Sequence, residues 1–554
     1  MNLRLYTLVS TRYASKIILF LFFTMIFYAG AKSTFGVTPP LDQPRPVPAV
    51  DTTKVSKDST TKTFVYLERA DSLVFDEATT RNANLFLGNV CFRHDSAYMY
   101  CDSAYFFEAQ NSLEAYGNVR IVQGDTLFVY GDYLLYDGNT QLAQIRENVK
   151  MENRNVTLLT DSLDYDRAAN IAYYFEGGVI ADSGNVLTSR RGTYFPATKE
   201  TLFEENVKLE NDKFVLTTDS LQYNTSTSIA TFIAFTNIVS DSSVINTTNG
   251  WYNTQSEYSV LLDRSEVWNK HRKVVGDSLV YDKQVGKAEV FGRVEMRDTT
   301  ENMALFGEYA FFDEKTEYSF ITDSALFIQY GKEDTLYLHA DSLKSLPDSI
   351  FKIVRAYKQV RFYRTSGQGV CDSMEFFTRD SMLHMYTSPV LWSGENQLTG
   401  DTISALMNDS TIQYAHIRPF AFSVQQVDSL CFNQLSGKDM MVYFNDGELE
   451  RIDLNGNVET IFYPLEEDST MIGLNRAVSS FLTMYMKNQK LERLKMWPNI
   501  EGSLTPLLKI VDENRHLKGF NWYNEIRPTG PEDVFRKPKQ VVAPTEERRV
   551  RKRR

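Results

Sequence analysis

Apolar and polar residues alternate with a period of two along most of the chain between residues 64 and 406. The pattern is clearest in DSLVFD (71–76), DSLDYD (161–166), DSLQYN (219–224) and DSLVYD (277–282), where the second and fourth residues after the first Asp are apolar. Such alternation, rich in β-branched and aromatic residues and bounded by Asp, Ser, Asn and Gly, predicts short half-buried strands. Helical spacing is scarce here, so we expect an all-β protein.

A second short phrase recurs about every 30 residues, as GNV at 88–90 and 117–119 and as ENV at 147–149 and 205–207. Its last residue marks a series that consists of Val90, Val119, Val149, Val179, Val207, Ile238, Val267 and Val294, resuming after one blurred copy at Val360 and Val390. A fixed period of this size predicts a repeat architecture, in which each unit buries its apolar face by stacking on its neighbours. We expect about three strands in each repeat.

The polar residues of both phrases predict turns. Asp, Ser and Asn side chains bond to nearby backbone amides at a corner, and Gly tolerates a positive φ. Calcium binding by these aspartates is the weaker interpretation, because their spacing lacks the dense pattern that builds an oxygen cage. The fold that follows is an elongated repeat β-jellyroll or solenoid of stacked short antiparallel strands. The pattern leaves open whether its interior is a sealed core or a trough.

The ends of the chain differ from its middle in composition. Residues 1–31 combine early basic residues with an apolar run and a small-residue ending, which predicts a secretory signal peptide or an uncleaved membrane anchor. Residues 32–62 form a Pro- and Thr-rich linker, and residues 63–410 hold the repeats. We expect a second β module of the same type at 411–526, with a hairpin at Asp446-Gly447, and a basic disordered tail at 527–554.

Composition and motifs exclude several classes of function. The net charge of −12 argues against a nucleic-acid partner, since phosphates select basic surfaces. No catalytic or metal-binding motif is present, and the six histidines lack ligand spacing. We therefore predict no enzyme, no catalytic residues, no metal and no cofactor. The four cysteines are too few for a disulfide scaffold, although Cys91 and Cys101 either face each other across a hairpin or are buried thiols.

The phrases GNV and DSLxYD, together with GLNRAVSSFLTMYM (473–486) and MWPNIEGSLTPL (496–507), resemble the OstA-like family, relatives of the periplasmic lipopolysaccharide-transport proteins LptA and LptC. The resemblance spans about residues 63–526 and implies a twisted β-jellyroll open along one edge. It also implies a periplasmic bridge that carries lipopolysaccharide from the inner to the outer membrane, as part of outer-membrane assembly. The chain is much longer than the family's short bridge, so anchoring to either membrane stays open.

The resemblance assigns a role to the inward-facing apolar positions. They would line a trough for the acyl chains of lipid A, and comprise Leu73, Phe75, Val90, Phe92, Val119, Ile121, Leu127, Val129, Val149, Met151, Leu163, Tyr165, Val207, Leu209, Leu221 and Tyr223. Candidate rim cations for an anionic headgroup include Arg120, Arg146, Lys150, Arg190 and Arg191. Edge strands at the ends of the stack would pair with other jellyroll proteins of the transport system or with a second copy.

Two other functions remain open from the sequence. One is a structural or adhesive exported β-solenoid, whose sealed core would bind no ligand. The other is a β-helical enzyme that cleaves polysaccharides, which would need clustered carboxylates that the repeat does not supply.

Overall fold

The computed structural model describes residues 64–537, except 76–80, 155, 183, 242, 333, 349–350, 409–410, 446–447, 467–469 and 488–489. The predicted signal or anchor and the linker lie outside this part. The described chain divides into two compact units, which we call the N-terminal unit, up to Val267, and the C-terminal unit, from Trp268.

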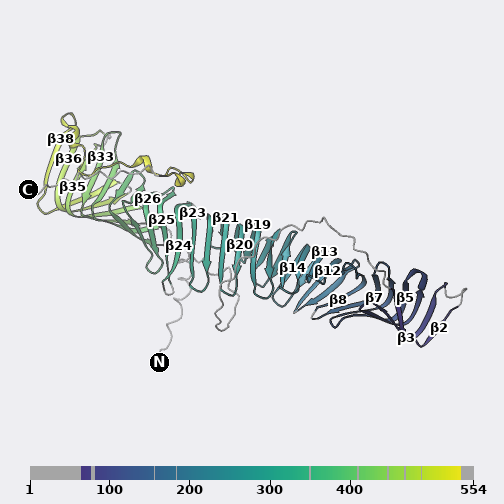
Figure 1. The fold of residues 1–554 in the computed structure, drawn as a ribbon. Helices are drawn as coiled ribbons and strands as arrows, with labels where there is room; N and C mark the ends of the chain where they lie inside the picture. Colours follow the sequence, from purple (N-terminus) through teal and green to yellow (C-terminus); the bar gives the residue numbers. More distant parts are fainter. Residues whose placement is uncertain are drawn as a thin grey trace, which may run out of the picture. The chain divides into compact units, whose positions relative to one another are not determined.

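The N-terminal unit is built from antiparallel strands that follow one another in the order of the sequence (Figure 1). Its elements are β1 (Tyr66–Arg69), β2 (Ser72–Val74), β3 (Asn84–His94), β4 (Ala97–Phe107), the 3₁₀ turn η1 (Glu108–Gln110), β5 (Ser112–Gln123), β6 (Leu127–Asp137), β7 (Leu142–Asn153), β8 (Val156–Asp166), β9 (Ile171–Tyr174), β10 (Gly178–Asp182), β11 (Asn185–Ser189), β12 (Arg191–Phe195), β13 (Glu200–Glu210), β14 (Phe214–Asn224), β15 (Ile229–Phe232), β16 (Thr236–Ser240), β17 (Val244–Thr247), β18 (Asn249–Asn253) and β19 (Tyr258–Asn269), whose last two residues lie beyond the division. The prediction of an all-β fold is confirmed.

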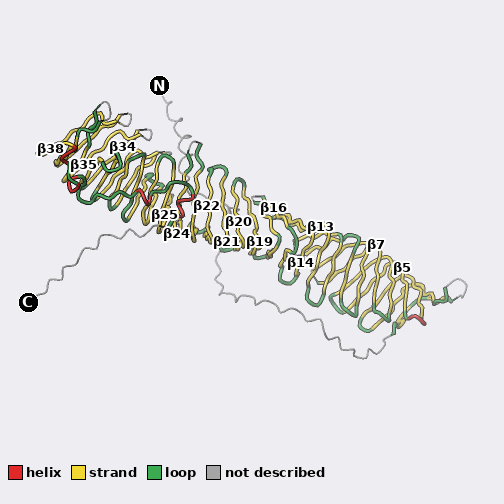
Figure 2. The backbone as a smooth tube through the Cα atoms, turned by 90° about the horizontal axis from the view of Figure 1, so that it is seen from above, coloured by secondary structure: helices red, strands yellow, loops and turns green. Residues whose placement is uncertain are grey.

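The C-terminal unit continues in the same style and ends in short 3₁₀ turns, drawn in red in Figure 2. Its elements are β20 (Arg272–Asp282), β21 (Lys287–Asp298), β22 (Met303–Asp313), β23 (Tyr318–Gln329), β24 (Leu336–Asp348), β25 (Phe351–Arg364), β26 (Gly367–Phe377), β27 (Met382–Tyr386), β28 (Val390–Ser393), β29 (Asn396–Thr399), β30 (Thr402–Asn408), β31 (Thr411–Arg418), β32 (Ala421–Gln426), β33 (Phe432–Gly437), β34 (Asp439–Asn445), β35 (Glu448–Phe462), β36 (Gly473–Lys487), β37 (Lys490–Trp497), β38 (Glu501–Pro506), η2 (Leu507–Lys509), η3 (Asp512–Asn514), η4 (Asn524–Ile526) and η5 (Glu532–Phe535).

The repeated GNV phrase is a bend inside a strand, which corrects its interpretation as a turn between strands. In β5, Gly117 and Asn118 have φ values of 74° and 45°, and both oppose the single residue Asp132 of β6. Two residues against one is a β-bulge, which bends the strand without ending it. The strands that contain such a bend run for 11 to 15 residues, longer than the short strands predicted, and a repeat such as 112–137 holds two strands in place of three.

The same pair of left-handed residues recurs through both units. It is found at 88–89, 117–118, 147–148, 205–206, 263–264, 292–293, 323–324, 358–359, 387–388 and 456–457. Gly, Asn and Asp adopt this conformation at the lowest cost, which explains why they recur there. The pair at 323–324, Asp-Ser, is the copy that the sequence pattern blurred.

Hydrogen bonds between neighbouring bends hold the bent strands in register. Asn118 Nδ2 donates to Asp102 Oδ2 over 2.8 Å, and Asn89 makes the same bond with Asp71 over 2.8 Å. Asn148 donates to Asp132 over 2.5 Å. Asp71 opens the phrase DSLVFD, and Asp102 and Asp132 open the related stretches DSAYFF and DYLLYD. The two phrases therefore recur together because each bend is bonded to the strand before it.

The marker residue after each bend points into the interior. Val90, Val119, Val149 and Val207 are each 1% exposed. Val179 is an exception at 38% exposed, since its neighbour Ile180 takes the inward position at 2%.

The predicted hairpin around 446–447 is confirmed by the pairing of Asn445 with Glu448. The stretch from 475 to 486 is part of the strand β36.

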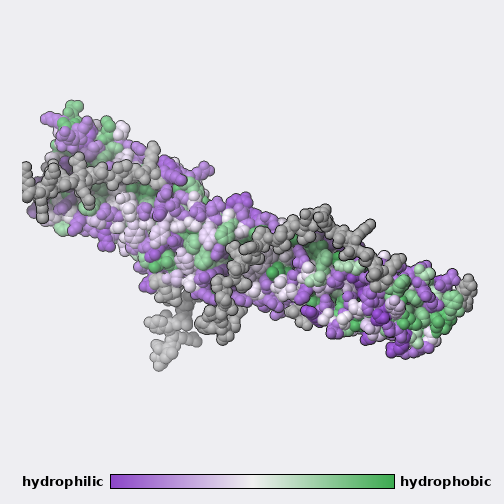
Figure 3. Space-filling view, viewed as in Figure 1, coloured by the Kyte–Doolittle hydropathy of each residue, from purple (hydrophilic) through white to green (hydrophobic). Residues whose placement is uncertain are grey.

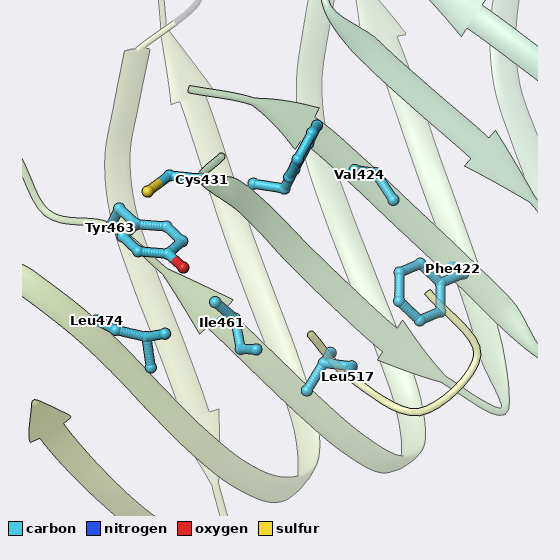
Figure 4. Close-up of a cluster of buried hydrophobic side chains, with 8 residues drawn as sticks. Phe422, Val424, Cys431, Ile461, Tyr463, Leu474 and Leu517 are labelled. Atoms are coloured by element: carbon cyan, nitrogen blue, oxygen red, sulfur yellow. The ribbon is translucent and has the colours of Figure 1, made fainter. Parts of the chain in front are cut away.

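Residues 507–536, which we call the C-terminal strap, run back over strands far earlier in the sequence. Gln434 donates to the Arg515 carbonyl over 2.7 Å and accepts from the Leu517 amide over 2.8 Å. Gln397 makes the same pair of bonds, both 2.8 Å long, with Asn521 and Tyr523. Leu517 packs into a core of eight buried side chains, which comprises Phe422, Val424, Cys431, Phe432, Ile461, Tyr463, Leu474 and Leu517 (Figure 4).

The far end of the strap is held by a buried arginine. Arg361, only 2% exposed, donates to the carbonyls of Ile526 and Asp533 over 3.0 and 3.3 Å. Val534 is fully buried, and the ring of Phe535 lies 4.8 Å from that of His339. The predicted start of a disordered tail at 527 is therefore wrong, because residues 527–536 pack on the C-terminal unit.

Candidate functional site

Fourteen of the sixteen predicted lining residues are buried in the interior of the N-terminal unit. They are Val90, Phe92, Val119, Ile121, Leu127, Val129, Val149, Met151, Leu163, Tyr165, Val207, Leu209, Leu221 and Tyr223, none more than 8% exposed. Leu73 and Phe75 are corrections, since they are 57% and 61% exposed. Leu73 lies in β2 and Phe75 directly after it, and among the described residues β2 pairs with β3 alone.

The interior carries a continuous apolar row from strand to strand. Each member faces the next across a strand pair, and the row consists of Phe92, Met99, Ile121, Val129, Met151, Leu158, Ile180, Leu187, Leu209, Leu216, Ile238 and Ile245. The row contains no charged or polar side chain. It therefore presents a uniform hydrocarbon surface along the unit.

A second interior row alternates tyrosine with small residues. Its members, again paired from strand to strand, are Tyr136, Ala143, Tyr165, Ala172, Tyr194, Thr201, Tyr223, Ala230, Tyr252 and Ser259. The tyrosines at 136, 165, 194, 223 and 252 are each 29 residues apart. The small residues leave room for the rings, and this strict spacing is a sequence signal that the prediction missed.

The tyrosine hydroxyls reach side chains at the opposite edge of the bent sheet. Asn153 Nδ2 donates to the Tyr194 hydroxyl over 3.0 Å. The Tyr165 hydroxyl has two acceptors in reach, Gln123 Oε1 at 3.2 Å on the opposite edge and Asn170 Oδ1 at 3.0 Å on its own edge. Hairpin turns alternate between the two edges, with Gln123 and Asn153 at one edge and the tyrosines near the other. We call the line where these edges meet the seam.

Two further tyrosines complete the row of bonds across the seam. His94 Nδ1 lies 2.5 Å from the Tyr136 hydroxyl, and Asn185 Nδ2 donates to the Tyr223 hydroxyl over 3.3 Å. Burial raises the pKa of Tyr136, as it does for Tyr165 and Tyr194, so these phenols remain neutral near pH 7. The hydroxyl groups in these bonds are therefore uncharged. Charged side chains lie beside the row at its two ends.

Charged side chains stand at the seam beside these bonds. Arg167 donates to the Tyr136 hydroxyl over 2.6 Å and to the His94 carbonyl over 3.3 Å. Lys213 and Glu257 form an ion pair across the seam. Cations therefore lie at the border between the apolar interior and the solvent.

Most of the predicted rim cations are paired on the surface. Arg146 bonds to Asp164 over 2.6 Å and Lys150 to Glu152 over 2.5 Å. Arg190 and Arg191 each lie 3.3 Å from Glu205. Arg120 instead covers the ring of Tyr100, with 4.5 Å between the guanidinium carbon and the ring centre. Exposed pairs of this kind contribute little to stability and hold no ligand by themselves.

A cavity of about 500 Å³ follows the bends of β3 to β7. It is lined largely by the polar groups of the bends, among them Asn89, Asp102, Asn118 and Asp132, which are already bonded along the strands as described above. Its shape follows from the bulges.

The four cysteines are buried free thiols, which decides between the two predicted alternatives. Cys91 faces Tyr100 and Cys101 faces Val90 across the β3–β4 pair, so the two thiols are not opposite each other. Burial raises the pKa of Cys101 to about 12. In the part of the chain that the structure describes, no cluster of three His, Cys, Asp or Glu is placed to hold a metal ion.

Comparison with known proteins finds a family match over the N-terminal unit. The model of the family "OstA-like protein" matches residues 62–219 and 210–277. Residues 62–277 of this chain are therefore similar to the OstA-like family. The matched OstA-like region includes the bends, both interior rows and the seam of the N-terminal unit.

One solved structure similar to this chain is LptH from Pseudomonas aeruginosa, described as the LptA-homologous periplasmic component of a lipopolysaccharide transport device. The identity is 15%, the match covers 21% of this chain and 81% of LptH, and the TM-score is 0.18. No curated protein matches the chain. Within the described residues no helix is long and apolar enough to cross a membrane.

Proposed function

We propose that this protein is a non-enzymatic carrier for lipopolysaccharide in the periplasm, with the acyl chains of lipid A in the interior of the N-terminal unit. The observation that carries the proposal is the unbroken apolar row from Phe92 to Ile245, to which each of twelve strands between β3 and β17 contributes one apolar side chain. Transfer of acyl chains from water to such a surface releases about 0.8 kcal/mol per buried methylene, so a lipid with several chains binds without any catalytic group.

The border of the interior supports an anionic amphiphile as the ligand. Cationic Arg167 stands at the seam, where the headgroup of a lipid with buried chains would lie, whereas Lys213 is paired there with Glu257. Charge-assisted bonds from arginine or lysine to phosphate are among the stronger polar contacts available to a protein. The match of residues 62–277 to the OstA-like family points in the same direction.

The ends of the units support contact with other jellyrolls. Exposed apolar side chains gather on the first strands, and they include Phe64, Tyr66, Leu67, Leu73 and Phe75 (Figure 3). At the other end β38 pairs with β36, and its residues are mostly exposed. An uncovered strand edge offers free backbone groups to a further strand. We propose that these edges receive other transport jellyrolls or a second copy.

A structural β-stack is the second candidate, and one observation favours it. The interior side chains are already packed, with Phe92, Val129 and Leu209 fully buried. In that case the interior would never admit a ligand.

Native mass spectrometry of the exported full chain separates the two functions. The chain is mixed with lipid A, or with its deacylated phosphorylated sugar at the same concentration. The carrier binds lipid A and not the sugar, because affinity comes from the chains. A chain that stays unliganded with both probes is the structural stack, and binding of the sugar alone would place recognition at surface cations.

A further inference from the structure

We propose that the tyrosine bonds across the seam are latches of a lateral gate, through which the lipid enters the interior sideways along the N-terminal unit. The inference rests on the proposed function. It names the entry route and the residues that control it, namely the pairs His94–Tyr136, Gln123–Tyr165, Asn153–Tyr194 and Asn185–Tyr223.

The latches differ in kind from the bonds between neighbouring strands. Neighbouring strands are joined by long ladders of backbone bonds, as in the ten residue pairs of β7 with β8 that run from Leu142–Asp166 to Asn153–Val156, with the bend between them. The latches are made by side chains, which rotate away without unfolding a strand. A side-chain bond of this kind is worth only about 0.5–1.5 kcal/mol net, so the seam is the part of the interior wall that opens at the lowest cost.

The packing of the tyrosine row also fits a gate. Because every tyrosine alternates with a small residue, two successive rings are separated by a strand with Ala or Thr at that level. Tyr165 and Tyr194 therefore each face small residues on both neighbouring strands, whereas Tyr136 faces Leu113 on one side. A row built only to fill a core gains more from large residues at every strand, since interiors pack densely.

The chemistry at the seam matches the two halves of the ligand. Behind the hydroxyls lies the apolar row, and beside them lie Arg167 and Lys213. When a latch opens, its amide and hydroxyl groups become free at the border. They then pair with the sugar hydroxyls and phosphates of the headgroup while the chains lie inside, so the lost latch bonds are replaced.

A cleavable cross-link across the seam tests the gate. Two cysteine pairs replace latches, Gln123→Cys with Tyr165→Cys and Asn153→Cys with Tyr194→Cys, in the full exported chain. A short bismaleimide with a central disulfide joins each pair, and a reductant releases it. The matched control joins Gln110→Cys to Asn139→Cys, which are neighbours on one edge, since Asn139 Nδ2 donates to the Gln110 carbonyl over 2.7 Å.

Lipid A bound per chain is then counted by native mass spectrometry. The gate predicts that the locked chain takes up no lipid, that reductant restores uptake, and that the control loads whether joined or not. Equal loading of the locked and released chains overturns the gate, because the lipid then enters through an open end of the unit. The carrier function is not affected by that result. No loading of released, control and unmodified chains alike means that the carrier function itself fails.

A second variant tests the gate in case the cysteine variants do not fold. Tyr165→Phe with Tyr194→Phe keeps both rings and removes two latch bonds. Because two bonds of this strength are lost, we expect loading to accelerate about tenfold or more. An unchanged loading rate in the folded variant also overturns the gate.

Discussion

The bends inside the strands make a sharp prediction for two glycines of the N-terminal unit. Gly117 lies in the bend of β5 and Gly124 in the following turn, with φ values of 74° and 61°. Replacement by alanine places a Cβ in the left-handed region at both sites, which costs about 1 kcal/mol each. The two sites differ in what that Cβ meets.

At Gly117 the new Cβ would lie 2.6 Å from Asp102 Oδ2 and 3.2 Å from Asp102 Cβ, whereas nothing lies within 4 Å at Gly124. Asp102 must move, and the bond that it accepts from Asn118 over 2.8 Å is then lost. Loss of a bond to a charged group at an exposed site adds about 1.5 kcal/mol. We therefore expect about 2.5 kcal/mol for Gly117→Ala and about 1 kcal/mol for Gly124→Ala.

Hydrogen exchange of the β5–β6 amides, read by mass spectrometry of proteolytic fragments, measures this difference as the free energy of local opening. Exchange should accelerate about fiftyfold in Gly117→Ala and about fivefold in Gly124→Ala. Equal acceleration in the two variants would refute the reasoning, because it would show that the bond between bends contributes nothing to the register.

Three further outcomes follow from the C-terminal strap and the buried groups. Gln434→Ala removes two bonds to the strap and should loosen it by about 2 kcal/mol, seen as faster trypsin cleavage at Arg515 while cleavage in the N-terminal unit is unchanged. Burial lowers the pKa of His339, which lies against Phe535, Arg361 and Asp341, below its usual 6.5. The neutral imidazole of His339 contributes its full stabilisation of the fold above pH 6.5, and this contribution is lost as the pH falls through the lowered pKa. Between pH 7.5 and 5 the Tm of the unaltered chain should therefore fall further than the Tm of His339→Gln. The buried thiols, of which Cys101 has a pKa raised to about 12, should react with a thiol reagent only after denaturation, and rapid labelling of the native chain would contradict their burial.

The strand type and the inward positions were predictable because they follow from a period-2 pattern. Alternation decides which side chains face inward, and it correctly indicated Ile121, Val129 and Leu209. It was wrong for Leu73 and Phe75, since alternation says which face a residue lies on and not whether another strand covers that face. Exposure at the end of a stack depends on neighbours that the local sequence does not contain.

The sequence pattern did not reveal that the bends are bulges inside strands. Gly, Asn and Asp serve turns and bulges alike, because both need a left-handed backbone, so the residues at 117–118 do not distinguish the two. The C-terminal strap was missed for another reason. Its anchors, such as Gln397 and Gln434, bind backbone groups more than 80 residues away, and a backbone partner leaves no mark in the sequence.

Photo-crosslinking inside cells that make lipopolysaccharide tests the central claim most directly. A photoreactive amino acid replaces Ile121, which is 2% exposed, or the outward-facing neighbour Arg120 as control, in the full exported chain. The account predicts an adduct of glycolipid mass at Ile121 and none at Arg120. A folded, exported protein that forms no adduct at Ile121, or equal adducts at both sites, would contradict an interior that holds acyl chains.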